Sequence, residues 1–261
     1  SKGIQPHLTV ILVGDDPASK VYVGRKGRIA KKIGFSEQTI TLPQSTSEQE
    51  LLDILEGLNK DDSVDGILVQ LPLPKHIHSQ KVLECIDPTK DVDGFHPINV
   101  GQLHSGIGGY IPCTAQGVID ILEDIAQKEE GFCIEGKVAV VIGRSNIVGR
   151  PAAALLEQKN ATVILCHSRT KDLPSLTKMA DIIVVAVGRP NMITGEHLKE
   201  GCVVIDVGIN RMEDGSLVGD ADFQSCKTKT SYITPVPGGV GPLTIANLLK
   251  NTYLSHVKRN S

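Results

Sequence analysis

The stretch Val138-Ala-Val-Val-Ile142-Gly143-Arg-Ser-Asn-Ile-Val-Gly149-Arg-Pro151 decides the fold. Its apolar half is typical of a buried strand, and the residues from Val148 to Gln158 follow a helical pattern. A glycine-bounded turn between a strand and a helix is where the phosphate-binding turn of a Rossmann lobe lies. Gly143 permits a tight turn, Ser145 replaces the second glycine of the ideal motif and offers a hydroxyl, and helix amides near Gly149 would face a phosphate. An ordinary glycine-containing turn would give the same local pattern.

The next predicted strand, Ala161–Leu165, bears on which dinucleotide binds. NAD-specific lobes place an acid near the end of this strand to hold the ribose 2′-hydroxyl, but no acid appears here before Asp172. Ser168, Arg169 and Arg144 are instead suited to a 2′-phosphate, because an arginine offers several donors in one plane. A lone arginine would more simply be a solvated surface charge, whereas two near one predicted turn favour NADP over NAD.

Outward from this stretch, strand-like and helix-like segments alternate along the chain. Ser19 is the expected N-cap of the first helix and Gly34 its end, and Ser47-x-x-Glu50 is a capping box for the second. Because parallel strands need a crossover connection, usually helical, we predict an α/β protein with parallel sheet in two unequal lobes. The predicted strands are 8–13, 64–69, 138–142, 161–165, 182–187 and 203–207; the predicted helices are 19–33, one from Ser47, 116–126, 148–158, 173–179 and 243–253.

Composition excludes several classes of protein. A net charge of −3 over 261 residues, a pI near 6.2 and the lack of a basic run argue against nucleic acid as a partner. Apolar stretches such as Val138–Ile142 are far shorter than the roughly 20 residues that cross a bilayer, so we expect no membrane span.

Six isolated cysteines without a C-x-x-C pair argue against a metal site and fit a reducing cytoplasm. The chain opens with Ser1-Lys2-Gly3-Ile4, without an initiator Met or a signal peptide, so a trimmed chain is expected rather than an exported precursor.

Tyr22 and Lys26 stand one helical turn apart, so their side chains project from one face of the first predicted helix. Arg25 and Arg28 border Lys26. If Lys26 is also partly desolvated, its ammonium form is disfavoured and the side chain can act as a base near neutral pH. A helical lysine is more usually solvated, and the spacing alone does not decide between the two interpretations.

Tyr22 and Lys26 belong to the segment Asp16-Pro-Ala-Ser-Lys-Val-Tyr-Val-Gly-Arg-Lys26. This segment resembles a signature of the bifunctional methylenetetrahydrofolate dehydrogenase/methenyltetrahydrofolate cyclohydrolase family. Further motifs agree with that family in order and spacing, and together they cover almost the whole chain. They are Asp65-Gly-Ile-Leu-Val-Gln-Leu-Pro-Leu-Pro74, Lys90-Asp-Val-Asp-Gly94, Gly143-Arg-Ser-Asn-Ile-Val-Gly149, Asp206-Val-Gly-Ile-Asn210 and Thr234-Pro-Val-Pro-Gly-Gly-Val-Gly-Pro-Leu-Thr244.

The resemblance implies a catalytic, folate-binding lobe of residues 1–115 plus 243–261, a Rossmann NADP lobe of residues 116–242, a folate cleft between them and a cytoplasmic homodimer. It also implies that NADP oxidises 5,10-methylenetetrahydrofolate to the methenyl form, which is then hydrolysed to 10-formyltetrahydrofolate.

Carried over residue by residue, the resemblance makes Lys26 the catalytic lysine, with Tyr22 packing on the folate and Gln70 bonding Lys26 and the reacting region. Asp93 would bind the amino-pyrimidine edge of the pterin, although an acid in such a turn often bonds its own backbone. The remaining implied substrate-binding residues are Val69, Leu71, Pro237, Gly238, Gly239, Val240 and Gly241, and the implied cofactor-binding residues are Gly143, Arg144, Ser145, Ser168, Arg169 and Ile209.

The chain departs from the family pattern in three places. The segment before the first strand is short, Ala115 stands where proline is common, and Leu243 stands where methionine is common. The last exchange conserves volume and should be tolerated.

Two other functions remain open. One is another two-lobed NADP oxidoreductase, such as a shikimate-dehydrogenase-like protein, but an acidic substrate of that kind would more naturally meet arginine than Asp93. The other is a non-catalytic nucleotide-binding module, which predicts loss of the set Tyr22, Lys26, Gln70 and Asp93; all four are present.

Overall fold

The structure, a computed structural model, describes residues 5–260, so the segment Ser1–Ile4 that suggested a trimmed chain lies outside the described residues. The chain divides into two compact units. Unit 1 comprises Ser1–Gln102, Gly108–Ile111 and Leu248–Ser261, and unit 2 comprises Leu103–Ile107 and Pro112–Asn247. Both units are built on parallel sheets, which confirms the predicted α/β fold.

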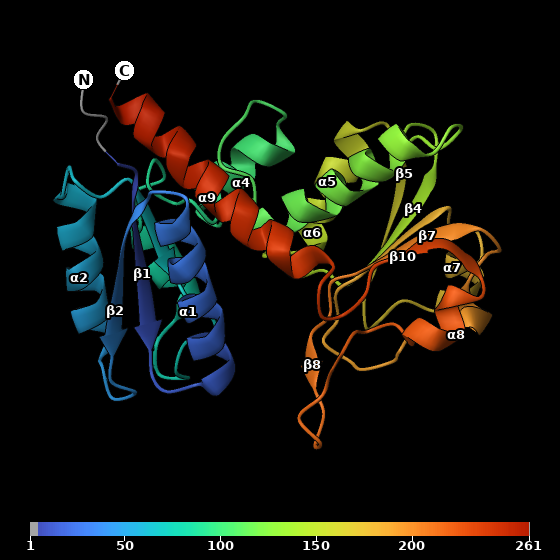
Figure 1. Ribbon diagram of the computed structural model, residues 1–261, viewed down its shortest axis with the longest axis horizontal. Helices are drawn as coiled ribbons and strands as arrows, with labels where there is room; N and C mark the ends of the chain where they lie inside the picture. The colour runs from blue at the N-terminus through green and yellow to red at the C-terminus, as the bar shows by residue number, and fades with distance from the viewer. Residues whose placement is uncertain (1–4, 261) are drawn as a thin grey trace. The chain divides into compact units, whose positions relative to one another are not determined.

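Unit 1 contains a three-stranded parallel sheet in the order β2-β1-β3. Figure 1 shows α1 and α2 on either side of this sheet. The strands are β1 (His7–Val13), β2 (Ser36–Leu42) and β3 (Gly66–Val69), and the helices are α1 (Pro17–Lys32), α2 (Glu48–Lys60), α3 (Ser79–Cys85) and α4 (Pro97–His104), whose last two residues belong to unit 2.

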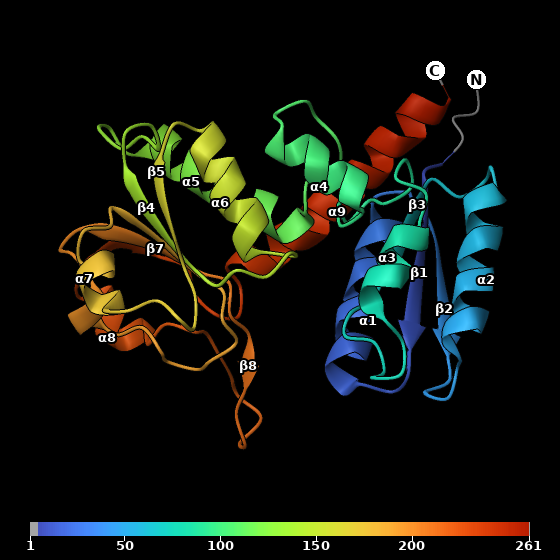
Figure 2. The same cartoon turned by 180° about the vertical axis from the view of Figure 1, so that it is seen from behind.

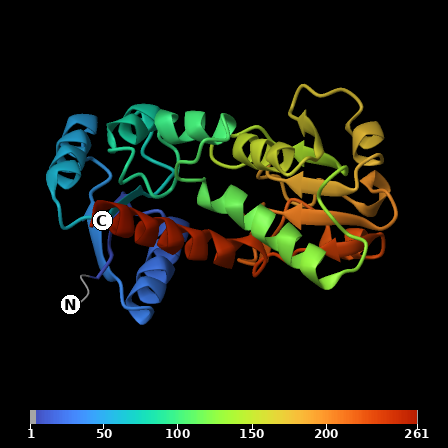
Figure 3. The same cartoon turned by 90° about the horizontal axis from the view of Figure 1, so that it is seen from above.

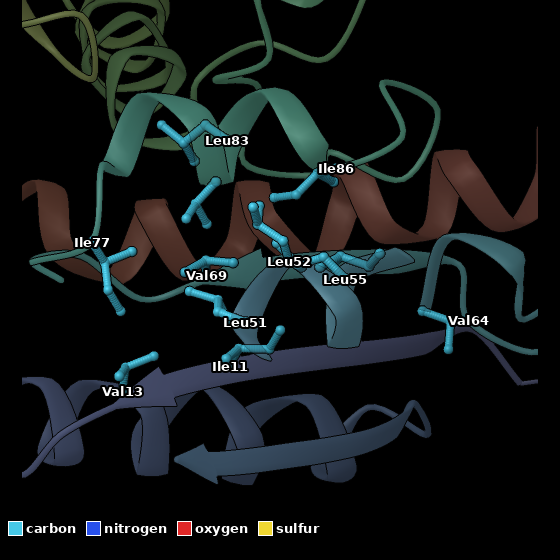
Figure 4. Packing of buried hydrophobic residues seen from close by; sticks show 12 residues of the cluster. Ile11, Val13, Leu51, Leu52, Leu55, Val64, Val69, Ile77, Leu83 and Ile86 are labelled. Atoms are coloured by element: carbon cyan, nitrogen blue, oxygen red, sulfur yellow. The ribbon is translucent and has the colours of Figure 1, made fainter. Parts of the chain in front are cut away.

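The core of unit 1 lies where α2 and α3 pack against the sheet. Ile11 from β1, Val69 from β3, Leu51 and Leu55 from α2 and Leu83 from α3 converge in one cluster (Figure 4). Burying such side chains contributes roughly 1.5–3 kcal/mol each. This packing fixes the carboxyl ends of β1 and β3, where the chain passes into loops.

The start of α1 differs from the prediction that Ser19 is its N-cap. The helix begins at Pro17 and its cap is Asp16, whose Oδ2 accepts the Ser19 N–H at 2.7 Å. Proline suits the first helical position because its fixed φ matches a helix and its missing N–H would lack an intrahelical partner there. The helix ends before Gly34 as predicted.

The capping box of α2 is confirmed, since Ser47 Oγ accepts the Glu50 N–H at 3.2 Å and Glu50 Oε2 accepts the Ser47 N–H at 2.7 Å.

The last helix, α9, runs over Val240–Arg259, longer than the predicted 243–253. Pro242 is tolerated because it lies in the first turn. Beyond Tyr253 the helix continues, and its buried Ser255 donates from Oγ to the backbone oxygens of Asp65 and Thr89, at 2.6 and 2.9 Å, which ties this end of α9 to unit 1. Seen from above, α9 is one uninterrupted helix (Figure 3).

Unit 2 contains a five-stranded parallel sheet in the order β10-β7-β6-β4-β5 and a separate two-stranded hairpin. Figures 1 and 2 show α5 and α6 together on one side of the larger sheet and α7 and α8 on the other. Its strands are β4 (Val138–Ile142), β5 (Thr162–Cys166), β6 (Ile182–Val185), β7 (Cys202–Asp206), β8 (Asn210–Arg211), β9 (Leu217–Val218) and β10 (Thr230–Ile233); its helices are α5 (Cys113–Lys128), α6 (Gly149–Gln158), α7 (Leu173–Thr177), η1 (Gly195–His197) and α8 (Phe223–Lys227).

The strand order of this sheet indicates where a ligand would bind. From β4 the chain goes to β5 on one side and then to β6 on the other side of β4. In such a Rossmann-like sheet, ligands lie at the carboxyl ends of the strands where the order reverses. The crevice is therefore expected beyond β4 and β6, next to the turn that follows Ile142.

Two further findings concern compartment and membranes. All six cysteines, each within the described residues, are free thiols. Over residues 5–260 no helix has both the length and the apolar character needed to cross a bilayer.

Candidate active site

Lys26 lies on the buried face of α1, with 5% of its surface exposed. Its Nζ donates to Gln70 Oε1 at 3.0 Å and stands 5.4 Å from the centre of the Tyr22 ring. Tyr22 is one turn back on the same helix face, as the spacing predicted. The structure thus brings together the three residues that the sequence assigned to catalysis, from two separate elements of unit 1.

Gln70 is held in one orientation. It follows β3 directly, its backbone N–H donates to Ile11 O at 2.8 Å, and its Nε2 donates to Leu71 O at 2.7 Å. Because the amide nitrogen is engaged, the oxygen faces Lys26. Val69, the preceding residue, is buried in the core at the end of β3. Gln70 is therefore an oriented acceptor rather than a mobile side chain.

Tyr22 carries a protonated phenol at neutral pH. Burial raises the pKa of Tyr22 above its usual value, the nearby Asp93 carboxylate raises it further, and Arg25 opposes both effects. Asp93 is half-buried and is close enough to Tyr22 for its charge to be felt. The charge of Asp93 therefore acts on the aromatic ring that lies beside Lys26.

The segment that carries Asp93 is fixed by residues to which the sequence assigned no role. Asp91 is almost fully buried, and its Oδ2 accepts the His96 N–H and the Asn99 Nδ2, both at 2.8 Å. Burial raises the pKa of Asp91 against these hydrogen bonds. Asn251 on α9 donates to Val92 O at 2.9 Å.

Lys90, in the same motif, is also buried and has a structural role. Its Nζ donates to the backbone oxygens of Leu58, Asn59 and Asp61 at 2.9, 2.8 and 2.6 Å, at the end of α2. An ammonium group at a helix C-terminus bonds the carbonyls that have no intrahelical partner. For Lys90 and Asp91, the charged pattern Lys-Asp-x-Asp of residues 90–93 was the signal that the sequence offered.

In unit 2, the turn between β4 and α6 requires glycine at both ends. Gly143 has φ +118°, and a Cβ there would lie 2.1 Å from Ala186 O. A Cβ on Gly149 would lie 1.9 Å from Gly143 O. The turn therefore leaves a bare backbone at the N-terminus of α6, which is what a phosphate needs for close approach.

Ser145 lies inside this turn. Its Oγ accepts the N–H groups of Val148 and Gly149 at 3.2 and 3.4 Å. It therefore satisfies two donors at the start of α6 and acts as a cap, a role that the sequence did not indicate. Because the oxygen accepts, the hydroxyl proton is the part of Ser145 that can donate to an anion.

Arg144 and His167 line one hollow in unit 2, of about 570 Å³. Arg150 also lines it, and its Nε donates to Arg144 O at 3.3 Å. The other lining residues are His104, Ala153, Ala154, Glu157, Val163 and Leu165. Two arginines and one acid therefore line the hollow, and Arg144 and Arg150 are the groups that could bind an anion there.

Ser168 and Arg169 occupy the exposed turn that follows His167. The Arg169 N–H donates to His167 Nδ1 at 3.1 Å, and Thr170 Oγ1 accepts the His167 N–H at 2.8 Å. His167 Nδ1 is thus an acceptor that shapes this turn. Ser168 and Arg169 therefore stand in one turn after β5, which has its own hydrogen bonds, whereas Arg144, the third predicted 2′-phosphate residue, follows the neighbouring strand β4.

Of the other predicted site residues, Leu71 follows Gln70 in unit 1, and Ile209 and the segment Pro237–Gly241 belong to unit 2. Ile209 follows β7 and is 50% exposed. The segment Pro237–Gly241 begins after a cis Val236–Pro237 bond and has Gly238 at φ +113°. A Cβ on Gly239 would lie 2.8 Å from Pro235 O, so this turn too is closed to larger residues. Over residues 5–260, no cluster of three or more His, Cys, Asp and Glu side chains is placed to hold a metal ion.

The chain is similar to known proteins over both of its units. Residues 1–93 match the family model described as the tetrahydrofolate dehydrogenase/cyclohydrolase catalytic domain, and residues 112–260 match that of its NAD(P)-binding domain. The "Bifunctional protein FolD" of Wolinella succinogenes is 58% identical over 252 residues, which cover 97% of this chain and 86% of that protein.

Two solved structures are similar over nearly the whole chain. The bifunctional FolD of Campylobacter jejuni has a TM-score of 0.94 and 52% identity, and the match covers 99% of this chain and 90% of that one. The FolD of Trypanosoma brucei, solved with NADP cofactor and inhibitor, has a TM-score of 0.91 and 40% identity over 99% of this chain and 89% of that one.

Proposed function

Since the chain belongs to the tetrahydrofolate dehydrogenase/cyclohydrolase family, we propose that the set Lys26, Tyr22 and Gln70 is its reacting centre. The chain is an enzyme of one-carbon metabolism: it oxidises 5,10-methylenetetrahydrofolate with NADP to 5,10-methenyltetrahydrofolate and hydrolyses the product to 10-formyltetrahydrofolate. The single observation that supports this assignment of residues is the 3.0 Å hydrogen bond between buried Lys26 and an oriented Gln70.

In the dehydrogenase step these residues position the folate. When bound, NADP would supply the acceptor for the hydride that leaves the carbon bridging N5 and N10. Tyr22, whose phenol is neutral at physiological pH and whose pKa is raised further by burial, packs on the folate ring. Asp93 accepts hydrogen bonds from the amino-pyrimidine edge, and Val69 and Leu71 flank Gln70. Precise placement of donor and acceptor supplies much of the acceleration in such a transfer.

In the cyclohydrolase step water adds to the cationic methenyl carbon. Lys26 Nζ removes a proton from the adding water and returns it as the ring opens. Gln70 cannot titrate, so it holds Nζ in place and orients the reacting region. The bound cation itself disfavours the ammonium form of a buried lysine, because like charges repel.

The residues of the NADP site fit the cofactor. Gly143 and Gly149 leave a cradle that a Cβ would fill, and Ser145 can donate to the pyrophosphate. The 2′-phosphate is assigned to Arg144, Ser168 and Arg169, and Ile209 to the surface on which the cofactor lies. The turn Pro237, Gly238, Gly239, Val240 and Gly241 is assigned to the folate.

The proposed functional division uses the predicted lobes: residues 1–115 plus 243–261 form the catalytic, folate-binding lobe, and residues 116–242 form the NADP lobe, which adds the turn Pro237–Gly241 to the folate site. A cytoplasmic location agrees with six free thiols. A homodimer without nucleic-acid or membrane partners completes the proposal, on the strength of the family resemblance and of the low net charge of −3. Light scattering on the purified chain tests the dimer.

The test of the reacting centre is an assay with 5,10-methylenetetrahydrofolate and either NADP or NAD. Lys26→Met is expected to slow conversion of the methenyl intermediate by at least about 100-fold, the lower range for loss of a general acid or base, so that the intermediate accumulates. Lys20→Met is the matched control, because Lys20 lies on the same helix but is half exposed and pairs with Asp15. Equal cyclohydrolase rates in both variants would remove Lys26 from the mechanism.

A further inference from the structure

Two aspartates outside the assigned site are buried side by side in unit 2. Asp206 ends β7 and Asp220 follows β9; they are 3% and 0% exposed. Asp206 Oδ1 accepts the Asp220 N–H at 3.0 Å, and Asp206 Oδ2 accepts the Ala221 N–H at 2.8 Å. A buried carboxylate is costly unless its acceptor sites are filled, so such a pair requires an explanation.

The Asp220 carboxylate accepts hydrogen bonds from the backbone of the loop segment Val187–Arg189. Its Oδ2 accepts the N–H groups of Val187 and Gly188 at 2.6 and 2.9 Å, and its Oδ1 accepts the Arg189 N–H at 2.8 Å and Asn210 Nδ2 at 2.9 Å. Three successive backbone donors thus converge on one side chain. With a fourth donor from Asn210, the carboxylate's acceptor capacity is used up.

The loop Val187–Arg189 borders the ligand crevice of the sheet. It follows β6, the neighbour of β4, and just before it the Ala186 N–H donates to Ile142 O at 2.8 Å. Ala186 O is the atom that a Cβ on Gly143 would meet at 2.1 Å. The loop therefore lies beside the phosphate turn, on the opposite side of β4 from the β5 end, where the adenine ribose binds in this type of sheet. The nicotinamide half of the cofactor falls on the side of the loop.

Close packing keeps Asp220 in place. A Cβ on Gly208 would lie 2.2 Å from Asp220 Cγ, and a Cβ on Gly219 would lie 1.9 Å from Asp206 Oδ2. The Asp220 carboxylate thus packs against Gly208, two residues after Asp206, and the Asp206 carboxylate packs against Gly219, the residue before Asp220. The space around Asp220 admits no larger group.

We propose that Asp220 is a positioning residue for the dehydrogenase: by binding Val187–Arg189 and Asn210 it fixes the wall on which the nicotinamide half of NADP lies. This inference rests on the proposed function. It assigns to Asp220 no contact with cofactor or folate; its effect on hydride transfer is exerted through the backbone of the loop.

The test is Asp220→Asn, which keeps the shape of the side chain but replaces one acceptor oxygen with an NH2 donor. At least one backbone N–H of the loop then faces another donor, and that contact is repulsive. We expect the dissociation constant for NADP, measured by calorimetry, to rise at least ten-fold. The ratio of dehydrogenase kcat/KM for NADP to cyclohydrolase kcat/KM should fall by at least as much. Asp222→Asn is the matched control: Asp222 only caps α8 through the Ser225 N–H at 3.0 Å, and asparagine caps equally well, so both values should stay within two-fold.

Folding of each variant is checked by circular dichroism. If Asp220→Asn does not fold, Asn210→Ala takes its place, because it removes a single donor from Asp220; a rise of about three-fold in the NADP dissociation constant is then expected. A folded Asp220→Asn that binds NADP as tightly as the parent overturns the proposal, as does an equal loss of both activities. Failure of the parent to oxidise the folate would instead count against the proposed function, and the calorimetric comparison would still decide the role of Asp220.

Discussion

Gly149→Ala is the sharpest perturbation of the predicted phosphate turn, because a single methyl group meets backbone atoms that cannot swing away. The added Cβ would lie 1.9 Å from Gly143 O, 2.5 Å from Gly143 C and 3.1 Å from Arg144 N. Ordinary contact begins near 3.4 Å, so the first turn of α6 and the end of β4 must separate by about 1.5 Å.

That displacement sets the expected size of the effect. Overpacking of a well-packed site costs about 1–3 kcal/mol, which for a chain of this size lowers the melting temperature by about 3–10 °C. Catalysis should suffer more, because a misplacement of about 1 Å lowers a positioned reaction rate by about 100-fold. We therefore expect dehydrogenase kcat/KM for NADP to fall by about 100-fold in a protein that still folds.

The assay follows NADP reduction with methylenetetrahydrofolate and, separately, hydrolysis of added methenyltetrahydrofolate, which uses no hydride acceptor. Gly57→Ala is the control, since Gly57 lies in α2 with nothing within 4 Å of its Cβ position. That change should leave both activities intact and stabilise the protein by about 0.5–1 kcal/mol. Normal NADP affinity in folded Gly149→Ala would refute the assignment of this turn to the cofactor.

Three further predictions concern charged and polar groups. Gln70→Glu places a carboxylate beside Lys26 Nζ and favours the ammonium form, so the cyclohydrolase pH–rate profile should move up by at least about one unit; an unmoved profile would exclude Lys26 as the titrating group. Burial raises the pKa of Asp206 from 3.8 to about 6, so its stabilising contribution is complete below about pH 4 and is lost as pH rises to 6. The free energy of unfolding of the parent, relative to Asp206→Asn, should therefore fall by about 3 kcal/mol between pH 4 and 7 in urea titrations, and a flat difference would contradict the raised pKa. Lys90→Met removes the donor from three carbonyls and should destabilise the chain by about 2–4 kcal/mol in denaturant melts, while Lys60→Met, at an exposed position in α2, the helix whose end Lys90 binds, should change stability by less than about 0.5 kcal/mol.

The elements that could be predicted from sequence are those whose burial is uniform. β4 was predicted at its observed bounds, because a parallel strand covered on both faces is a continuous apolar run. β2 was missed, since it is the edge strand of its sheet and Gln38, Thr39 and Thr41 are exposed. The short helices α3, α4 and α8 were missed for a related reason: five to eight residues hold too few turns to establish a 3.6-residue period.

The site shows a similar limit. Helical spacing was enough to place Tyr22 and Lys26 on one face, but nothing local links Lys26 to Gln70, which is 44 residues away and came from family resemblance. Lys90 and Asp220 were missed because their partners are backbone groups, which leave no trace in the pattern of side chains. One signal was present: Asp206 ends a strand that is otherwise wholly apolar, and an acid at that position is either functional or bonded.

The crevice of unit 2 explains why backbone-binding carboxylates are used there. A cofactor that approaches the main chain closely requires glycine, as at Gly143 and Gly149, and glycine offers no side chain with which to pack. Rigidity must then come from hydrogen bonds to the backbone itself, and a carboxylate is the side chain able to accept several N–H groups at once. Asp220 does so for the loop after β6, and Asp206 holds Asp220. Burial, with a smaller contribution from the neighbouring Asp220 charge, raises the pKa of Asp206, so its carboxylate is costly to keep in place. An apolar replacement would remove that cost, but it would also leave the N–H groups of Asp220 and Ala221 without their acceptor and so loosen the support of the loop.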